Sequence, residues 1–455
     1  MKRLVVIVIA VLAGDHAVAA STAFINVNVL PMTSETVIKA QTVVVDQGKI
    51  IAIGDVDSVP VPEEAQVVDG TDRYLMPGLA EMHAHVPDAA SSDLDRVFSL
   101  FAANGVTTIR GMLGRPSHLK LRQDLLDGNA FGPRLITSGP SMNGNTVSSP
   151  ADGASKVRAQ HAAGYDFIKI HPGLTAEEYE AIATTANELD IPFAGHVPSA
   201  VGLQSALSAG MATIDHLDGY LAAMMPADSD QSGGYGGFFG VMLAEQVIEG
   251  QIAVMAELTV AEDTWNVPTE ALFEHFVSAV GVTELSNRPE MQYMPPATVR
   301  QWVQSKERQL GERGFSAELA ARAIDIRRKL ILALHRAGAG LLLGSDAPQV
   351  FNVPGFSLHH ELGLLVAAGL TPFEALQTGT TAVARFLGIN TGSVEIGRDA
   401  DLVLLDANPL DDISHARRVH GVMLRGGWHS RRDLEERLAT YRSQALLLES
   451  ERGRR

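Results

Sequence analysis

The sequence predicts an α/β protein built on an eight-stranded (β/α)₈ barrel of the TIM type, with a small composite β-sandwich beside it. Short apolar runs alternate with helical segments through the middle of the chain, as in successive βαβ units. Towards both ends the pattern changes to short β-branched strands broken by Gly, Pro and Asp, which is typical of hairpins. The 455 residues suffice for one large barrel and one small domain.

The β-sandwich is predicted from two distant segments, residues 20–75 and 391–430. The first contains the runs FINVNVL, TVVVDQGKIIAIG and AQVVDG, and the second contains GSVEIGRDADLVLLDANP and RVHGVMLRGG. Because both segments have the same short-strand pattern, we expect them to form one sandwich. Residues 431–455 are expected to follow it as a C-terminal helical tail.

The barrel is predicted over residues 76–390. Its candidate strands are GLAEMHAH, VTTIR, PRLITS, FIKIH, PFAGH, ATIDH, IAVMAELTV and GLLLGSD. The stretch before the last strand is longer than one barrel unit needs and carries a charged amphipathic segment, so we expect a helical insertion at about 261–335. Residues 227–240, rich in Gly and Ser, are expected to form a loop, with a role as a lid left open.

The N-terminus resembles a secretory signal. Lys2 and Arg3 precede an apolar run of about eleven residues, and Ala17 and Ala19 flank Val18 as at a cleavage site. Residues 1–19 are therefore predicted to be a signal peptide, which places the mature chain in the periplasm or outside the cell. The run is shorter than the roughly twenty residues that span a bilayer, so a retained anchor is the weaker alternative.

The amino-acid composition excludes several kinds of partner and of catalytic or metal-binding group. A net charge of −17 would repel a phosphate backbone, so no nucleic acid partner is expected. The chain has no cysteine, which excludes disulfides, thiolate metal sites and cysteine nucleophiles. We expect a small-molecule substrate and no membrane contact after signal cleavage, while a homo-oligomer is left open.

A candidate metal site begins at the first barrel strand. His83 and His85 flank Ala84 near the strand end, and the two-residue period of a strand points both imidazoles to one side. An HxH pattern alone arises easily by chance. In a barrel, however, the carboxyl ends of all strands converge on one face, where active sites form. Four further residues stand at or near such ends: Lys169, His196, His216 and Asp346.

The ligand set makes electrostatic sense except for its lysine. Four neutral imidazoles and one carboxylate can hold zinc or a similar divalent metal without a thiolate. A buried ammonium beside a metal cation is unfavourable. One resolution is that Lys169 is neutral and has reacted with carbon dioxide to form a carbamate, whose anionic oxygens can bridge two metals. Taken singly, each residue also has a structural explanation, as a buried histidine, a surface-reaching lysine or a helix cap.

Several motifs together carry a resemblance to a known family. They are PGLAEMHAH, GVTTIR, FIKIH, GHVPSAVGLQSALSAGMATIDHLDG, LLLGSDAP, LHHELGLLVAAGLTPFEALQTGTTAVARFLG and GSVEIGRDADLVLLDANP. The chain resembles the amidohydrolase superfamily over most of its mature length. Within it, the chain is similar to the imidazolonepropionase-like and Xaa-Pro or Xaa-Lys/Arg dipeptidase-like branch.

The resemblance implies a binuclear centre, with zinc as the expected metal. One metal is held by His83, His85 and Asp346, the other by His196 and His216, and carboxylated Lys169 bridges them. Such a centre lowers the pKa of a bridging water and polarises a scissile carbonyl, so that hydroxide attacks. Asp346 would act as the proton shuttle from this water to the leaving amine.

The resemblance implies hydrolysis of an amide, peptide or cyclic amide C–N bond. The same site could act on a lactone, ester or organophosphate, and a non-catalytic barrel that binds a small molecule is a third alternative. Tyr220 and His171 are candidate substrate contacts, with support of the ligands as the alternative for His171. In the loop after the third strand, Asn143 and Asn145 stand where dipeptidase-like relatives carry a histidine, which argues against a dipeptide substrate.

Overall fold

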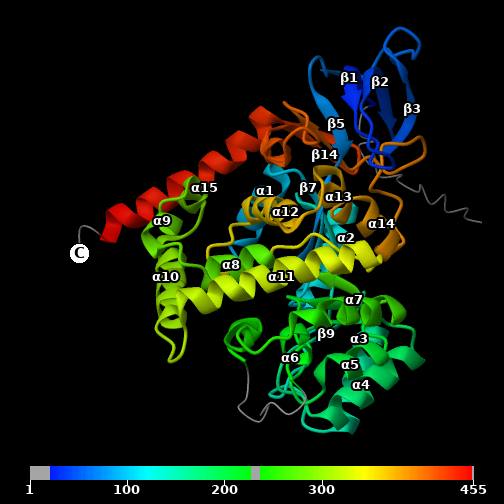
Figure 1. Cartoon of the computed structure of the whole chain (residues 1–455). Helices are drawn as coiled ribbons and strands as arrows, with labels where there is room; N and C mark the ends of the chain where they lie inside the picture. Colours follow the sequence, from blue (N-terminus) through cyan, green and yellow to red (C-terminus); the bar gives the residue numbers. More distant parts are fainter. Residues whose placement is uncertain (1–20, 227–235, 453–455) are drawn as a thin grey trace, which may run out of the picture.

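The computed structural model describes residues 21–226 and 236–452 (Figure 1). The predicted signal peptide and most of the predicted loop at 227–240 lie outside these residues. Parallel strands form the centre of the chain and helices pack around them, while a separate sheet lies at one end (Figure 1). Within the described ranges, no helix is both long enough and apolar enough to cross a membrane.

The central strands form two parallel sheets whose members match six of the predicted runs. The first sheet contains β6 (Leu79–Ala84), β7 (Val106–Gly111) and β8 (Arg134–Thr137). The second contains β9 (Ile168–Ile170), β10 (Phe193–Gly195), β11 (Thr213–Asp215) and β12 (Trp265–Val267). This is an α/β fold of the TIM-barrel type.

The two sheets meet through single bridges rather than through continuous ladders. Residues 341–347, predicted as the last barrel strand, run between β12 and β6 in this irregular form: Leu342 donates to the carbonyl of Asn266, and Met82 donates to the carbonyl of Leu343. The bridges that join the sheets are Ser138–Phe167, Met142–Ile170, Asn266–Leu341 and Ala84–Ala347. A strictly closed ring of eight regular strands is therefore not found among the described residues.

The prediction of a strand at IAVMAELTV is wrong, because these residues form helix α7 (Ile252–Ala261). Its buried residues are Ile252, Met255, Ala256 and Thr259, a helical spacing. A short apolar run of this kind cannot be assigned to strand or helix by periodicity alone, and Ala, Met, Glu and Leu favour a helix. The strand is instead β12, which lies inside the range predicted as a helical insertion.

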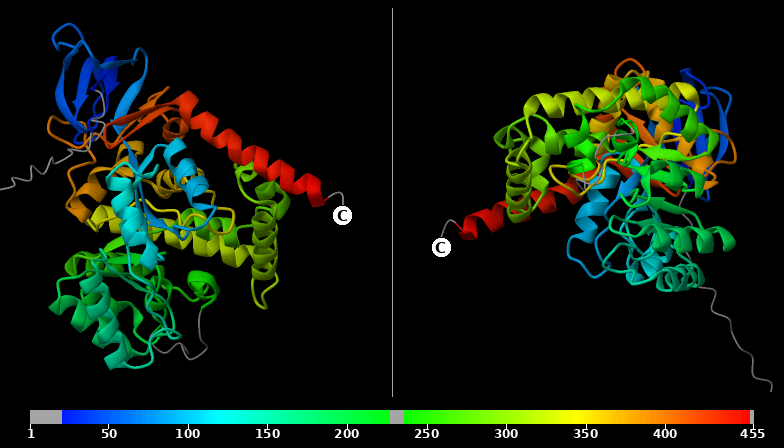
Figure 2. Two further views of the ribbon diagram at one scale, coloured as in Figure 1. Left: turned by 180° about the vertical axis from the view of Figure 1, so that it is seen from behind. Right: turned by 60° about the horizontal axis from the view of Figure 1, so that its bottom comes forward.

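Helices cover the strands and extend beyond them. Figure 2 shows from two further sides that α15 (red) runs from the terminal sheet towards α9 and α10. The helices besides α7 are α1 (Leu94–Ala103), α2 (Pro116–Leu126), α3 (Pro150–Ala163), α4 (Ala176–Glu188), α5 (Gly202–Ser208), α6 (Tyr220–Ala223), α8 (Glu270–Val277), α9 (Val282–Ser286), α10 (Pro296–Leu310), α11 (Ala317–Ala337), α12 (Phe356–Ala368), α13 (Pro372–Thr378), α14 (Thr381–Leu387) and α15 (Arg431–Arg452), with 3₁₀ turns including η2 (Phe238–Leu243).

The terminal sheet combines strands from both ends of the chain. Its order is β15-β14-β13-β5-β1-β2-β3, with β4 paired to β1. The strands are β1 (Thr22–Val29), β2 (Ile38–Asp46), β3 (Lys49–Asp55), β4 (Gln66–Asp69), β5 (Tyr74–Pro77), β13 (Leu402–Leu405), β14 (Val419–Leu424) and β15 (Gly427–Ser430). Antiparallel pairing of β5 with β13 joins the two segments. All eight strands belong to one hydrogen-bonded sheet, so the predicted two-sheet sandwich is not confirmed.

The terminal sheet has an apolar core to which both segments contribute. Phe24 and Leu75 come from the N-terminal segment, while Leu404 and Met423 come from the C-terminal one, and all four are completely buried. The ring of Phe24 packs edge-on against Trp428, with 5.1 Å between ring centroids. Neither segment can bury this surface without the other.

Leu404→Ala should therefore destabilise the protein by about 2–5 kcal/mol, because it opens a cavity in the core shared by the two segments. The free energy of unfolding is measured by urea denaturation. Ile396→Ala is the control, since the Ile396 side chain is 65% exposed and its removal opens no cavity. Equal stability of the two variants would show that the segments do not depend on each other.

Candidate metal centre

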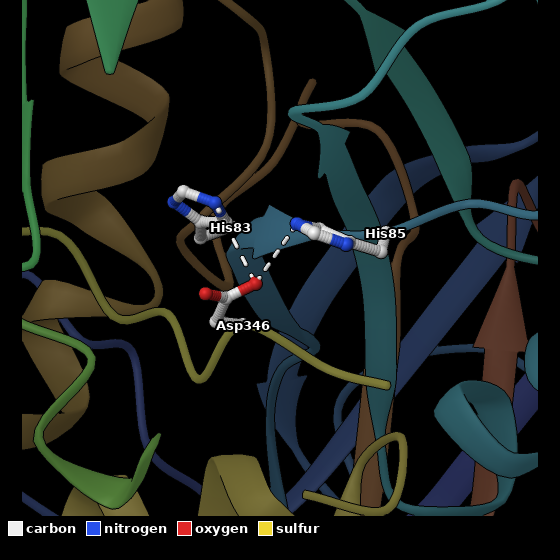
Figure 3. A group of neighbouring side chains, drawn as sticks. All are labelled: His83, His85 and Asp346. Atoms are coloured by element: carbon white, nitrogen blue, oxygen red, sulfur yellow. Dashed lines mark ion pairs between the residues drawn. The ribbon is translucent and has the colours of Figure 1, made fainter. Parts of the chain in front are cut away.

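Three of the predicted ligands lie close together at one end of the parallel strands (Figure 3). His83 belongs to β6, His85 follows it, and Asp346 lies in the extended segment beside β6. Asp346 Oδ1 is 3.0 Å from His85 Nε2 and 3.6 Å from His83 Nε2. One ligand atom from each residue lies within 4.8 Å of the others. Two imidazoles and a carboxylate in this arrangement can hold a divalent ion.

His196 and His216 extend this group. They directly follow β10 and β11, and both are buried. The His216 ring lies 4.5 Å from the His83 ring and 4.7 Å from the His196 ring, measured between centroids. His216 Nδ1 is 3.8 Å from Asp346 Oδ2. The structure thus brings all four predicted histidine ligands and Asp346 to one place.

Lys169 projects into the interior from β9 and is completely buried. Its Nζ lies 3.5 Å from Asp215 Oδ2. Burial lowers the pKa of the Lys169 ammonium, although the nearby Asp215 carboxylate opposes the shift. A lowered pKa favours the neutral amine, which is the form that can react with carbon dioxide.

Asp215 is a central residue that the sequence analysis missed. It is completely buried, and its Oδ2 lies 3.0 Å from His83 Nδ1. Its Oδ1 accepts hydrogen bonds from Arg110 Nη2 at 3.1 Å and from the Thr213 hydroxyl at 2.8 Å. The two-residue period of a strand could have identified Asp215, because Thr213 and Asp215 lie two residues apart and therefore point to the same face of β11.

Two histidines are oriented by hydrogen bonds at Nδ1. His196 Nδ1 lies 3.1 Å from Asp218 Oδ2, and His216 Nδ1 lies 2.8 Å from the Thr269 hydroxyl. When Nδ1 is engaged in this way, Nε2 remains as the lone-pair donor for a metal. Thr269 lies 53 residues from His216 in the sequence, so no local pattern could have paired them.

The Asp346 backbone is held by a buried network. Glu81 accepts hydrogen bonds from the His83 backbone at 3.0 Å and from the Ser345 backbone and hydroxyl at 2.7 and 2.5 Å. Burial raises the pKa of Glu81 to about 8. The Asn352 side-chain amide donates to the Ser345 carbonyl. The residue before Asp346 is thus fixed from two sides.

Several polar atoms of the cluster have no hydrogen-bond partner within residues 21–226 and 236–452. They are His83 Nδ1, Lys169 Nζ, Asp215 Oδ2 and Asp346 Oδ1. They lie within ion-pair distance of other members of the cluster, His83 Nδ1 and Lys169 Nζ of Asp215 Oδ2 and Asp346 Oδ1 of His85 Nε2, so their hydrogen-bonding capacity is only partly used and can accept a further group. Divalent cations and an anionic lysine adduct are suited to this donor set.

The two candidate substrate contacts lie in different surroundings. His171 Nδ1 lies 2.6 Å from the Ser141 hydroxyl, and its ring packs 4.9 Å from the His196 ring. A contact of His171 with substrate stays a prediction. Tyr220 is completely buried, and its hydroxyl lies 2.8 Å from the Thr259 hydroxyl. This burial argues against the predicted contact, because the hydroxyl is already bonded within the core.

A pocket of about 590 Å³ adjoins the cluster. Its lining includes Val197 and Asp218, which closely follow the predicted ligands His196 and His216, and Phe239 of η2. The Phe239 ring stacks on the His216 ring, with 4.5 Å between centroids and 4° between planes. Pockets of roughly 300–1,000 Å³ are typical for small molecules.

Comparisons with known proteins give consistent results. The model of the Amidohydrolase family matches residues 74–428. No curated protein matches the sequence significantly. Three similar solved structures are a putative prolidase from Bifidobacterium longum (22% identity, 93% of this chain and 99% of that chain, TM-score 0.67), a bottromycin amidohydrolase (23%, 93% and 90%, 0.71) and a Xaa-Pro dipeptidase with bound methionine (19%, 90% and 100%, 0.64). At these identities the structures support the fold.

Thr269→Val should weaken zinc binding by about 10–100-fold, because His216 loses the group that orients its ring. The change keeps the shape of the side chain and removes only the hydroxyl. Thr269→Ser keeps the hydroxyl and should bind zinc as the unchanged protein does. Competition with a chromogenic chelator gives the affinities. Equal affinity of the Val and Ser variants would show that this hydrogen bond does not position the ligand.

Proposed function

The chain belongs to the amidohydrolase family, and we propose that it is an exported, metal-dependent hydrolase of an amide, peptide or cyclic amide C–N bond. The convergence of His83, His85, His196, His216 and Asp346 in one buried cluster supports this function most strongly. Export is proposed from the N-terminal sequence pattern alone and places the enzyme in the periplasm or outside the cell.

The proposed centre holds two divalent ions, with zinc as the expected metal. His83, His85 and Asp346 would hold one ion, and His196 and His216 the other. Lys169 would bridge them as a carbamate, a role supported by its burial and by the lowered pKa of its amine. When bound, two such ions supply Lewis acidity, which lowers the pKa of a water and polarises a carbonyl.

Asp346 is the proposed proton shuttle. Its carboxylate faces three imidazoles, with Oδ1 towards His83 and His85 and Oδ2 towards His216. A carboxylate in this position can accept the proton of an attacking water and deliver it to the leaving nitrogen, which must be protonated to depart as an amine. Glu81 and Asn352 keep the Asp346 backbone in place through Ser345.

The similar solved structures support a C–N bond as the target. They are those of a putative prolidase, a Xaa-Pro dipeptidase and a bottromycin amidohydrolase. These three enzymes are named for different substrates, and membership of the amidohydrolase family does not specify a substrate. We therefore take the reaction class from the family and the substrate from the pocket of this chain.

Asp346→Asn should lower kcat by about 10²–10⁴-fold, because the amide can no longer accept the proton of the attacking water. Zinc-loaded mature chain is first screened by mass spectrometry against dipeptides, N-acyl amino acids, cyclic amides, lactones and esters. Turnover of the best substrate is then compared for the two forms. Asp190→Asn, an exposed site, is the control.

Three results would contradict this function. Unchanged turnover in Asp346→Asn would remove the proton shuttle. No bound metal by elemental analysis, after expression with zinc or manganese, would remove the metal centre. Cleavage of lactones or esters but of no amide would replace the proposed bond with a C–O bond.

A further inference from the structure

The pocket beside the proposed metal centre is lined by residues that neighbour two of the proposed ligands. We name it the apolar pocket and define it by Val197, Leu221, Phe239 and Leu243. Val197 directly follows the proposed ligand His196, and the Phe239 ring stacks on His216. In barrels of this type the loops after the strands form the active face. Phe239 therefore stands between the apolar pocket and the proposed centre, and a substrate that reaches both would place a side group one ring away from the reacting bond.

Apolar side chains from three elements make up most of the wall. Leu203 comes from α5, Leu221 from α6, and Phe239 and Leu243 from η2. Gly240 has a φ of 80°, and a Cβ there would lie 3.2 Å from Leu221 Cβ. A glycine at this position lets η2 pack closely against α6. The result is a largely apolar surface suited to a ring or a branched alkyl group.

The apolar pocket offers no cation to an anionic ligand. Among the described residues, its lining contains neither lysine nor arginine, and Asp218 is the one charged residue there. Asp218 Oδ2 is already engaged by His196 Nδ1 and the Val197 amide. Burying a carboxylate without a cation is costly, so a charged ligand is disfavoured here.

We propose that the apolar pocket binds a bulky, uncharged side group of the substrate, aromatic or branched aliphatic. The substrate is then a hydrophobic amide and not a dipeptide with a charged group at this position. The assignment to a substrate rests on the proposed function, whereas binding of an apolar group by the pocket can be measured without turnover.

The binding test uses 2-acetonaphthone, a neutral ring that the enzyme cannot hydrolyse. Its affinity for the zinc-loaded mature chain is measured by fluorescence titration. Leu243→Glu should weaken binding by at least about tenfold, because it places a carboxylate against the ring. Leu243→Met keeps an apolar wall and should retain the affinity, as should Val254→Glu, whose side chain is 48% exposed on α7 and outside the pocket. Thermal unfolding verifies that each variant is folded.

If Leu243→Glu binds the probe as the unchanged protein does, or if Val254→Glu weakens binding equally, the assignment is wrong. Should Leu243→Glu fail to fold, Ala222→Glu replaces it, because Ala222 lines the same pocket and is only half-buried.

A turnover test separates this inference from the proposed function. N-acetyl methylamides of phenylalanine, leucine, glutamate and lysine are compared by kcat/KM, and the first two should be favoured by about tenfold or more. A higher kcat/KM for the glutamate or lysine methylamide would contradict the assignment of the apolar pocket to an uncharged group. The proposed hydrolase function would still stand. Hydrolysis of no amide in this set or in the broader screen would count against the hydrolase, while the probe titration would still decide the pocket.

Discussion

The buried carboxylate of Asp215 is the interaction on which the arrangement of the centre depends. It lies in the dry interior and faces Lys169, His83 and Arg110 from three different strands. A charge without access to water must be paired, so these groups have to converge on it. Arg110 also donates to the Met82 carbonyl at 2.7 Å, which ties β7 to β6 beside the proposed ligands. The positions of Lys169 and His83 thus follow largely from satisfying one carboxylate.

Polar and apolar parts of the active face have separate roles. Inside the barrel, Glu81, Asp215 and Thr269 contact the proposed ligands His83 and His216 through hydrogen bonds or close charge contacts. Above the strands, Phe239 and its neighbours enclose an apolar space that touches the centre through His216. The first part is suited to activating water and moving protons, and the second to selecting the group beside the reacting bond. Changes in η2 can therefore alter substrate preference without moving a proposed ligand.

The sequence predicted the proposed ligands because each stands at a strand end within a short motif. It failed where contacts join distant segments: Ser345 bonds Glu81 across 264 residues, and His216 bonds Thr269 across 53. The run at 252–260 was taken for a strand because the periodicity of a short apolar run fits a buried strand and a buried helix alike. The two end segments were correctly placed together, but their strands pair in one sheet. Tyr220 was selected for its nearness to His216 in sequence, although its hydroxyl bonds Thr259 in the core.

The most direct measurement is anomalous X-ray diffraction from crystals of the zinc-loaded mature chain, recorded at the zinc absorption edge. A binuclear centre predicts two anomalous peaks, one beside His83, His85 and Asp346 and one beside His196 and His216. It also predicts continuous density beyond Lys169 Nζ for a carbamate. A single peak, or a Lys169 side chain that ends as an ammonium paired with Asp215, would contradict it.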